Sequence, residues 1–255
     1  MRSLLRRSLP PQRAKNIPMS NTNRRTGLIV SLDTQDPAQA RQWVRDVAPV
    51  SGIIKLGLEF TYAAGFQAVA DVAAGSPLFL DLKLHDIPNT VGAAVRSLSH
   101  LRPRMLTLHA SGGRVMMEAA RAACDEAFPE GQRPLLLGVT VLTSLDDQGL
   151  AETGIMDGAR AQVRRLAKLA VQSGMDGLVC SAHELDVLRN DLGSDPVIVT
   201  PGIRPAGAAK GDQKRVMTPA QARDAGADWI VVGRPITQAA DAAAAAAAIM
   251  AELES

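Results

Sequence analysis

Residues 27–57 read GLIVSLDTQDPAQARQWVRDVAPVSGIIKLG, and this stretch contains two short apolar runs with a helix-like segment between them. The runs at Leu28–Leu32 and Gly52–Leu56 are apolar on both faces, as parallel strands are when helices cover the sheet. The segment Pro37–Val47 lies between the runs and predicts a helix. The stretch therefore predicts one strand–helix–strand unit.

The same alternation continues to the end of the chain. Six further strands are expected at Leu78–Leu82, Met105–His109, Leu135–Thr140, Gly177–Cys180, Val197–Thr200 and Trp229–Val232. Seven further helices are expected at Phe60–Ala73, Asn89–Ser99, Arg114–Ala127, Ala159–Ser173, Glu184–Asn190, Pro219–Ala225 and Pro235–Leu253. Eight units over about 229 residues have roughly 29 residues each, the size of a β-α-β repeat. We predict an α/β protein that folds as a single (β/α)8 TIM barrel.

A doubly wound open sheet is the alternative arrangement of the same repeat. That fold usually carries a Gly-rich dinucleotide loop or a Walker loop after an early strand, and the sequence contains neither. We therefore assign residues 27–255 to the barrel and residues 1–26 to a basic, disordered N-terminal extension. A transit peptide, or a start of translation at Met19, are alternative interpretations of the extension.

The charge of the chain is unevenly distributed. Residues 1–25 hold seven Lys and Arg residues and no acid, so the net charge of the rest is −5, whereas the whole chain carries +2. An acidic body and an aromatic content of 3% argue against binding to nucleic acid. Two cysteines and four scattered histidines predict no metal site and a cytoplasmic protein. No apolar stretch is long enough to cross a membrane.

Charged residues follow several of the predicted strands, at the end where a barrel carries its active site. Asp81 and Lys83 lie two residues apart in one strand, so their side chains are expected on the same face. Lys55 and Asp33 end two neighbouring strands and could join them in an array of alternating charges. A purely structural ion-pair network is the alternative, but buried ionic networks stabilise a fold weakly compared with apolar packing.

Gly233 and Arg234 follow the last predicted strand and precede a helix that begins at Pro235. Glycine amides, a guanidinium group and a helix N-terminus together suit a phosphate group, and barrels often bind phosphate after strands seven and eight. A surface arginine beside a turn glycine is the alternative. Together with the lysine–aspartate array, this site indicates an enzyme that acts on a small phosphorylated substrate.

Six motifs agree in order and spacing with one known family. They are Ser31-Leu-Asp33, Ile54-Lys55-Leu-Gly57, Asp81-Leu-Lys83-Leu-His85-Asp86-Ile-Pro-Asn89-Thr90, Thr140-Val-Leu-Thr143-Ser144, Thr200-Pro-Gly-Ile-Arg204-Pro and Val232-Gly233-Arg234-Pro-Ile. Over about residues 27 to 250 the chain resembles the orotidine 5′-phosphate decarboxylase family, and Gly211-Asp-Gln213 resembles the family's phosphate loop. Only the basic extension departs from the family pattern.

The resemblance implies conversion of orotidine 5′-monophosphate to UMP and CO2, the last step of de novo UMP synthesis, without a metal or an organic cofactor. It implies Lys83 as the proton donor to C6, with Asp81 beside the leaving carboxylate. Asp33 and Lys55 would hold the ribose hydroxyls and complete the array. It also implies a homodimer with shared active sites, in which Asp86 and Thr90 would reach into the partner's site.

The resemblance also implies the remaining substrate contacts. Thr143 and Ser144 would contact the pyrimidine, and Gln213 would bridge the base and the phosphate. Arg234 and the amide of Gly233 would hold the phosphate, while Arg204 would shape the loop that closes over it.

Two other function classes are left open by the sequence. Related barrel enzymes act on sugar phosphates, carry a similar Asp-x-Lys-x-x-Asp strand and bind Mg²⁺ through carboxylates. Lys55 argues against them, because a metal site would favour a carboxylate at that strand end. A barrel of this kind could also bind a nucleotide as a sensor, but the presence of every expected catalytic residue argues against that function.

Overall fold

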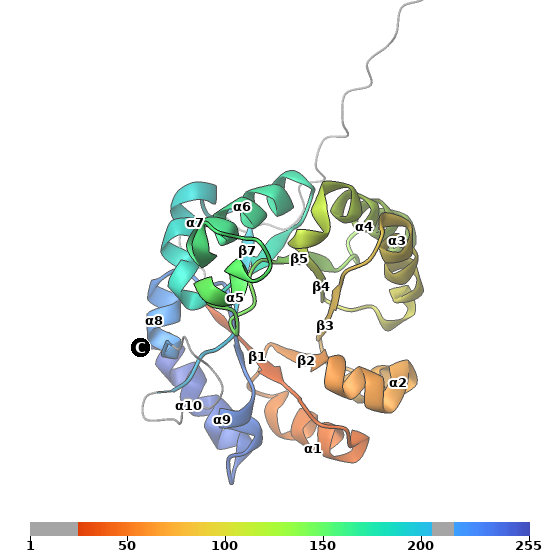
Figure 1. Ribbon diagram of the computed structural model, residues 1–255. Coiled ribbons are helices and arrows are strands. Elements are labelled where there is room, and N and C mark those ends of the chain that lie inside the picture. The colour runs from red at the N-terminus through yellow and green to blue at the C-terminus, as the bar shows by residue number, and fades with distance from the viewer. Residues whose placement is uncertain (1–24, 206–216) are drawn as a thin grey trace, which may run out of the picture.

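The computed structural model describes residues 25–205 and 217–255, and it contains a closed barrel of eight parallel strands. Each strand pairs with the next one along the chain, and β1 pairs with β8 to close the barrel (Figure 1). The strands are β1 (Gly27–Ser31), β2 (Ile53–Gly57), β3 (Leu78–Leu84), β4 (Met105–His109), β5 (Leu135–Val139), β6 (Gly177–Val179), β7 (Val197–Thr200) and β8 (Trp229–Val232). The predicted (β/α)8 barrel is confirmed.

Helices surround the barrel and connect its strands (Figure 1). They are α1 (Pro37–Val47), α2 (Leu58–Ala73), α3 (Pro88–Ser97), α4 (Gly113–Ala127), α5 (Asp147–Ala151), α6 (Gly158–Gln172), α7 (Leu185–Leu192), α8 (Pro219–Asp224), α9 (Arg234–Thr237) and α10 (Ala242–Glu254). Short 3₁₀ turns follow α3, follow β4 and precede α7. Within the described residues, no helix is long and apolar enough to span a membrane.

Two details of the predicted helices were wrong. The single helix expected at Pro235–Leu253 is divided into α9 and α10, because Asp241 starts a new helix by accepting a hydrogen bond from the Ala244 amide at 2.9 Å. The short helix α5 was not predicted, and it begins where the Asp146 carboxylate accepts a hydrogen bond from the Gly149 amide at 3.0 Å. Each of the two helices begins at its own capping aspartate.

The strands separate two hydrophobic cores. Alternate strand residues pack outward against the helices, and the residues between them fill the inside of the barrel. The inner core consists of Ile29, Ile53, Phe79, Met105, Leu137, Val199 and Val231. At the amino ends of the strands, the Trp229 ring occupies the space where a Cβ atom on Gly27 would stand.

The next inward position on each of the first four strands is polar. Ser31, Lys55, Asp81 and Thr107 each lie two residues beyond an inner-core residue, and all four are buried. The apolar layer therefore supports a polar layer at the carboxyl ends of the strands, where barrel enzymes carry their active sites.

Met105 tests the inner core, and Met156 provides a matched control. Met105 is 1% exposed, whereas Met156, in the loop between α5 and α6, is 78% exposed. Met105→Ala should lower the free energy of unfolding by about 2–5 kcal/mol, because it leaves a cavity inside the barrel. Met156→Ala should change it by less than about 0.5 kcal/mol. Urea unfolding of both variants measures the difference, and equal losses would show that Met105 does not support the barrel.

Candidate active site

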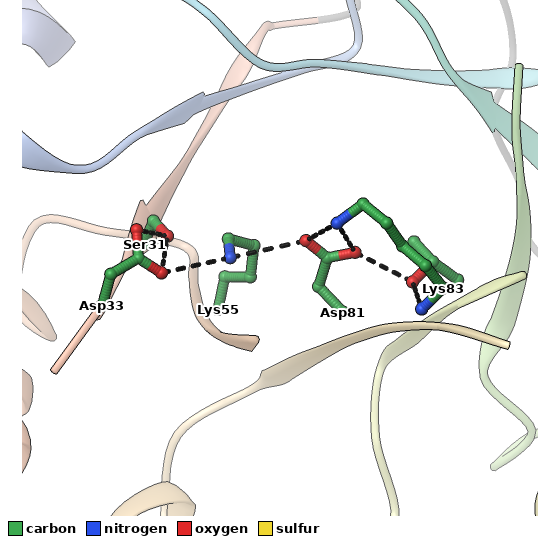
Figure 2. A network of polar contacts seen from close by, with 6 residues as sticks. Ser31, Asp33, Lys55, Asp81 and Lys83 are labelled. Atoms are coloured by element: carbon green, nitrogen blue, oxygen red, sulfur yellow. Dashed lines mark hydrogen bonds and ion pairs between the residues drawn. The ribbon is translucent and has the colours of Figure 1, made fainter. Parts of the chain in front are cut away.

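Four charged side chains form a continuous chain of ion pairs across the mouth of the barrel (Figure 2). Lys55 Nζ lies 3.5 Å from Asp33 Oδ1 and 3.4 Å from Asp81 Oδ2. Lys83 Nζ donates to both carboxylate oxygens of Asp81, at 2.9 and 2.8 Å. The structure thus brings together the four residues expected in one array, and their charges alternate in sign.

The two lysines of the array differ in exposure. The Lys55 side chain is 11% exposed and is enclosed between Asp33 and Asp81. The Lys83 side chain is 28% exposed. Lys83 is therefore the cation that presents more of its surface to a ligand entering the mouth of the barrel.

Asp81 is the buried centre of this array. Burial by itself raises the pKa of the Asp81 carboxyl, but the charges of Lys55 and Lys83 oppose this, helped by hydrogen bonds from Lys83 and Thr107. The net effect lowers the pKa of Asp81 below its ordinary value, so the group is a carboxylate at neutral pH.

The backbone around Lys83 departs from a regular strand. Leu80 and Leu84 of β3 pair with Leu106 and Leu108 of β4, so β3 holds two more residues than β4 between these pairs. Lys83 itself has a left-handed φ of 50°. Asp81 and Lys83 form an ion pair, as expected. The expectation assumed that β3 is a regular strand, and this assumption is wrong at Lys83.

Two hydroxyl groups support the array, and neither was expected from the sequence to have a role in the site. Ser31 Oγ donates to the Asp33 carboxylate at 2.9 Å. Thr107 Oγ1 donates to Asp81 Oδ1 at 2.9 Å and accepts a hydrogen bond from the Lys83 amide at 2.9 Å. Strand alternation puts Thr107 on the same face as Met105, but no local feature of the sequence marks this threonine as part of a site.

Four other expected site residues lie in the segments that follow β3 and β5. Asp86 and Thr90 are exposed, and the Asp86 carboxylate accepts a hydrogen bond from the Ile87 amide at 2.6 Å. Among the residues that the structure describes, Asp86 does not join the ion pairs of the array. Thr143 is half-buried and Ser144 is exposed, between β5 and α5.

The expected phosphate residues lie beside the array. Gly233 precedes α9, and a Cβ atom there would stand 3.3 Å from Ser31 Cβ and 3.5 Å from Asp33 Oδ2. Arg234 begins α9 and is exposed. Arg204 is buried, and both its burial and the charge of Arg234 lower the pKa of its guanidinium group. Two guanidinium groups that repel each other form a favourable environment for an anion.

Gln213 lies outside the described residues. The segments on either side of residues 206–216 meet next to Arg204, whose amide donates to the Met217 carbonyl at 3.0 Å.

The fold and the array define a class of (β/α)8-barrel enzymes with lysine–aspartate pairs at the carboxyl ends of the strands. The model of the orotidine 5′-phosphate decarboxylase / HUMPS family matches residues 26–249. The chain therefore belongs to this family, and the resemblance inferred from the six motifs is confirmed.

Individual relatives cover almost the whole chain. Orotidine 5′-phosphate decarboxylase from Gluconobacter oxydans is 57% identical over 91% of this chain and 99% of its own length. The enzyme of that name from Rhodospirillum rubrum is 50% identical over 89% of this chain and 93% of its own. Among solved structures, orotidine 5′-phosphate decarboxylase from Lactobacillus acidophilus is 38% identical with a TM-score of 0.80, covering 90% of this chain and 100% of that one.

Proposed function

We propose that the protein decarboxylates orotidine 5′-monophosphate to UMP and CO2, the last step of de novo UMP synthesis. The observation that carries this proposal is the continuous array of Asp33, Lys55, Asp81 and Lys83 in a member of the decarboxylase family. Relatives with this activity in their names are 57% and 50% identical over about nine tenths of the chain.

The chemistry requires a localised negative charge to be stabilised. When CO2 leaves C6, the electron pair stays in the plane of the pyrimidine ring, where the π system cannot delocalise it. The enzyme must lower the barrier by roughly 20 kcal/mol, near the upper end of what enzymes achieve. A fixed ammonium group close to C6 stabilises the developing charge and then donates a proton to the same atom.

Lys83 is the proton donor in this proposal. Its side chain is more exposed than that of Lys55, and two hydrogen bonds to Asp81 hold its ammonium group in place. As the bond between C6 and the carboxylate breaks, a proton moves from Lys83 Nζ to C6. The neutral amine then recovers a proton from solvent after UMP leaves.

Asp81 acts on the substrate carboxylate. Lys55 and Lys83 hold the Asp81 carboxyl ionised in a buried position. In the proposed complex, this negative charge faces the negative charge of the substrate carboxylate. This repulsion is relieved when neutral CO2 departs, so it favours the transition state over the bound substrate.

The other residues bind and orient the substrate. Asp33 and Lys55 hold the ribose hydroxyls, and Thr143 and Ser144 contact the pyrimidine. Gln213 bridges the base and the phosphate, which Arg234 and the Gly233 amide bind, while Arg204 shapes the adjacent loop. Binding of the distant phosphate contributes to the chemical rate by fixing C6 beside Lys83.

A Mg²⁺-dependent reaction on a sugar phosphate is the second candidate. The geometry of Lys55 favours decarboxylation without a metal, because its ammonium group lies between Asp33 and Asp81, at 3.5 and 3.4 Å. A divalent cation bound by these two carboxylates would occupy the same place as this ammonium group.

The direct test is the loss of orotidylate absorbance with EDTA-treated protein. The wild type should consume orotidylate at an undiminished rate in EDTA. Lys83→Ala should lower kcat by at least about a thousandfold, because it removes the proton donor, while UMP still binds. Lys168→Ala is the matched control, since Lys168 is a half-exposed lysine on α6 that pairs with Asp191 at 3.1 Å. A Lys83→Ala variant with a tenth of the wild-type kcat would contradict the assignment.

Arg234→Ala tests the phosphate site. A bidentate, charge-assisted contact is worth about 3 kcal/mol, so KM for orotidylate should rise about a hundredfold. The kcat/KM for orotidine, which has no phosphate, should change far less. Steady-state kinetics on both substrates measure this, with the exposed Arg160 replaced by alanine as the control. Equal losses on the two substrates would show that Arg234 acts elsewhere.

We also propose that the protein is a cytoplasmic homodimer with shared active sites. Several large apolar side chains are exposed on α2 and around α3 and α4, among them Tyr62 at 84%, Ile87 at 66% and Val115 at 66%. The helices α3 and α4 pack together on one side of the barrel (Figure 1). Exposed apolar side chains of this kind suit a protein interface. Asp86 precedes Ile87, so an interface that covers Ile87 would bring Asp86 to the partner chain.

Mixed dimers test the shared site. Inactive Lys83→Ala and Asp86→Ala chains are combined and allowed to exchange subunits. If Asp86 acts in the partner's site, each mixed dimer contains one site with both groups intact and one with neither. Half of the dimers are mixed in random pairing, so activity should recover to about a quarter of wild type. A mixture that remains inactive after demonstrated exchange would contradict the role of Asp86.

A further inference from the structure

We propose that Thr107 is a positioning residue for the decarboxylation, and that its single hydroxyl group fixes both the Asp81 carboxylate and the left-handed backbone of Lys83. The proposal rests on the proposed function for its kinetic effects. The contacts of Thr107 are independent of that function, and they lead to a separate measurement.

Lys83 has a backbone conformation that is unusual for a residue other than glycine. A residue with a side chain adopts a left-handed φ at a cost, because its Cβ approaches the carbonyl oxygen. Such a conformation persists only where surrounding contacts hold it, and it is concentrated at functional sites. In the described part of the chain, only Lys83 and Arg102 have a positive φ without being glycine.

Thr107 makes the contact that holds this backbone. The register between β3 and β4 shifts between Leu80 and Leu84. Within this irregular segment, the Lys83 amide donates to Thr107 Oγ1 at 2.9 Å. Thr107 thus accepts the amide hydrogen of the residue whose backbone is strained.

The hydroxyl proton of Thr107 has one possible direction. Thr107 Oγ1 lies 2.9 Å from Asp81 Oδ1, and an ionised carboxylate can only accept a hydrogen bond. The one hydroxyl proton of Thr107 therefore points to Asp81, which leaves its lone pairs for the Lys83 amide. Because Thr107 is fully buried, water does not compete for either contact.

One atom, Thr107 Oγ1, connects the side chain of Asp81 with the backbone of Lys83. Asp81 binds Lys83 Nζ directly, and Thr107 binds both the Asp81 carboxylate and the Lys83 backbone. Loss of the hydroxyl would leave a buried amide and a carboxylate oxygen each with one partner fewer. The Lys83 backbone could then relax, and its ammonium group would move relative to C6 while the phosphate and ribose contacts remained.

The test compares Thr107→Val, which removes the hydroxyl and keeps the shape, with Thr107→Ser, which keeps the hydroxyl. Thr107→Val should lower kcat about tenfold to a hundredfold, as expected for lost hydrogen bonds to charged and buried groups. KM for orotidylate and the Kd for UMP should change less than about threefold, since the substrate contacts remain. Thr107→Ser should restore kcat to within about threefold of wild type.

Thr26→Val is the matched control. Thr26 is buried at the other end of the barrel, and its hydroxyl donates to the Ala227 carbonyl at 2.8 Å. Its loss should lower the melting temperature without changing kcat. If Thr107→Val does not fold, Thr107→Cys replaces it, because its thiol stands in the place of the hydroxyl but is only a weak donor and a weak acceptor.

The pH profile of kcat gives a second readout. The hydrogen bond from Thr107 helps to lower the pKa of Asp81, so Asp81 should protonate at higher pH in Thr107→Val. The acid limb should therefore move to higher pH. The ionisable groups that act on Asp81 are Lys55 and Lys83, and His109 interacts electrostatically with Asp81, Lys83 and His85. If Thr107 had only a structural role, Thr107→Val would lower the stability of the protein and leave the acid limb of the kcat profile unchanged.

Hydrogen exchange separates this proposal from the proposed function. The Lys83 amide should exchange faster in Thr107→Val than in wild type and should be protected again in Thr107→Ser. If the wild type does not consume orotidylate, the proposed function fails and exchange at Lys83 still decides the role of Thr107. Thr107 has no positioning role if the valine variant keeps wild-type kcat, if serine does not rescue it, or if the Lys83 amide stays protected.

Discussion

The buried carboxylate of Asp81, held ionised between Lys55 and Lys83, is the interaction on which the candidate site depends. Alone in a dry position, this group would take up a proton. Two ammonium groups, of which that of Lys83 is also hydrogen-bonded to the carboxylate, and the Thr107 hydroxyl keep it charged instead. Such a cluster contributes little to stability compared with apolar packing. Its value lies in holding opposite charges at fixed positions before a substrate enters.

The barrel supplies the rigidity that this arrangement needs. The inner apolar core packs the strands against one another, and the polar layer lies directly above it. Ion pairs at the amino ends of the strands serve to hold the barrel together. Asp176 accepts a hydrogen bond from the Leu136 amide at 2.9 Å and pairs with Arg121, and Asp228 accepts one from the Ile198 amide at 2.7 Å and pairs with Arg189. There the charges fasten the amino ends of strands, whereas at the carboxyl ends they face the site.

The alternation of apolar runs and helix-like segments was sufficient to predict eight strands, their order and the closed barrel. It also identified the ends of the strands that carry Asp33, Lys55, Asp81, Lys83 and Arg234. These features are encoded locally, because strand and helix periods repeat over a few residues. The same period puts Thr107 on one face of its strand with Met105, but Thr107 was not predicted to belong to the site. Its importance was not visible, since one threonine on a strand has no distinctive local signal.

Tertiary structure alone decided how these residues meet. The left-handed backbone at Lys83 depends on a hydrogen bond to a residue 24 positions away, and Asp81 reaches the same hydroxyl across 26 positions. Both contacts lie where the register between β3 and β4 shifts. The division of the last helix into α9 and α10 depends on a capping contact of Asp241 that periodicity did not reveal. The sequence by itself therefore determined which side chains surround the mouth of the barrel. The pairing of distant strands determined the directions in which those side chains point, because register is set by contacts between strands and not within them.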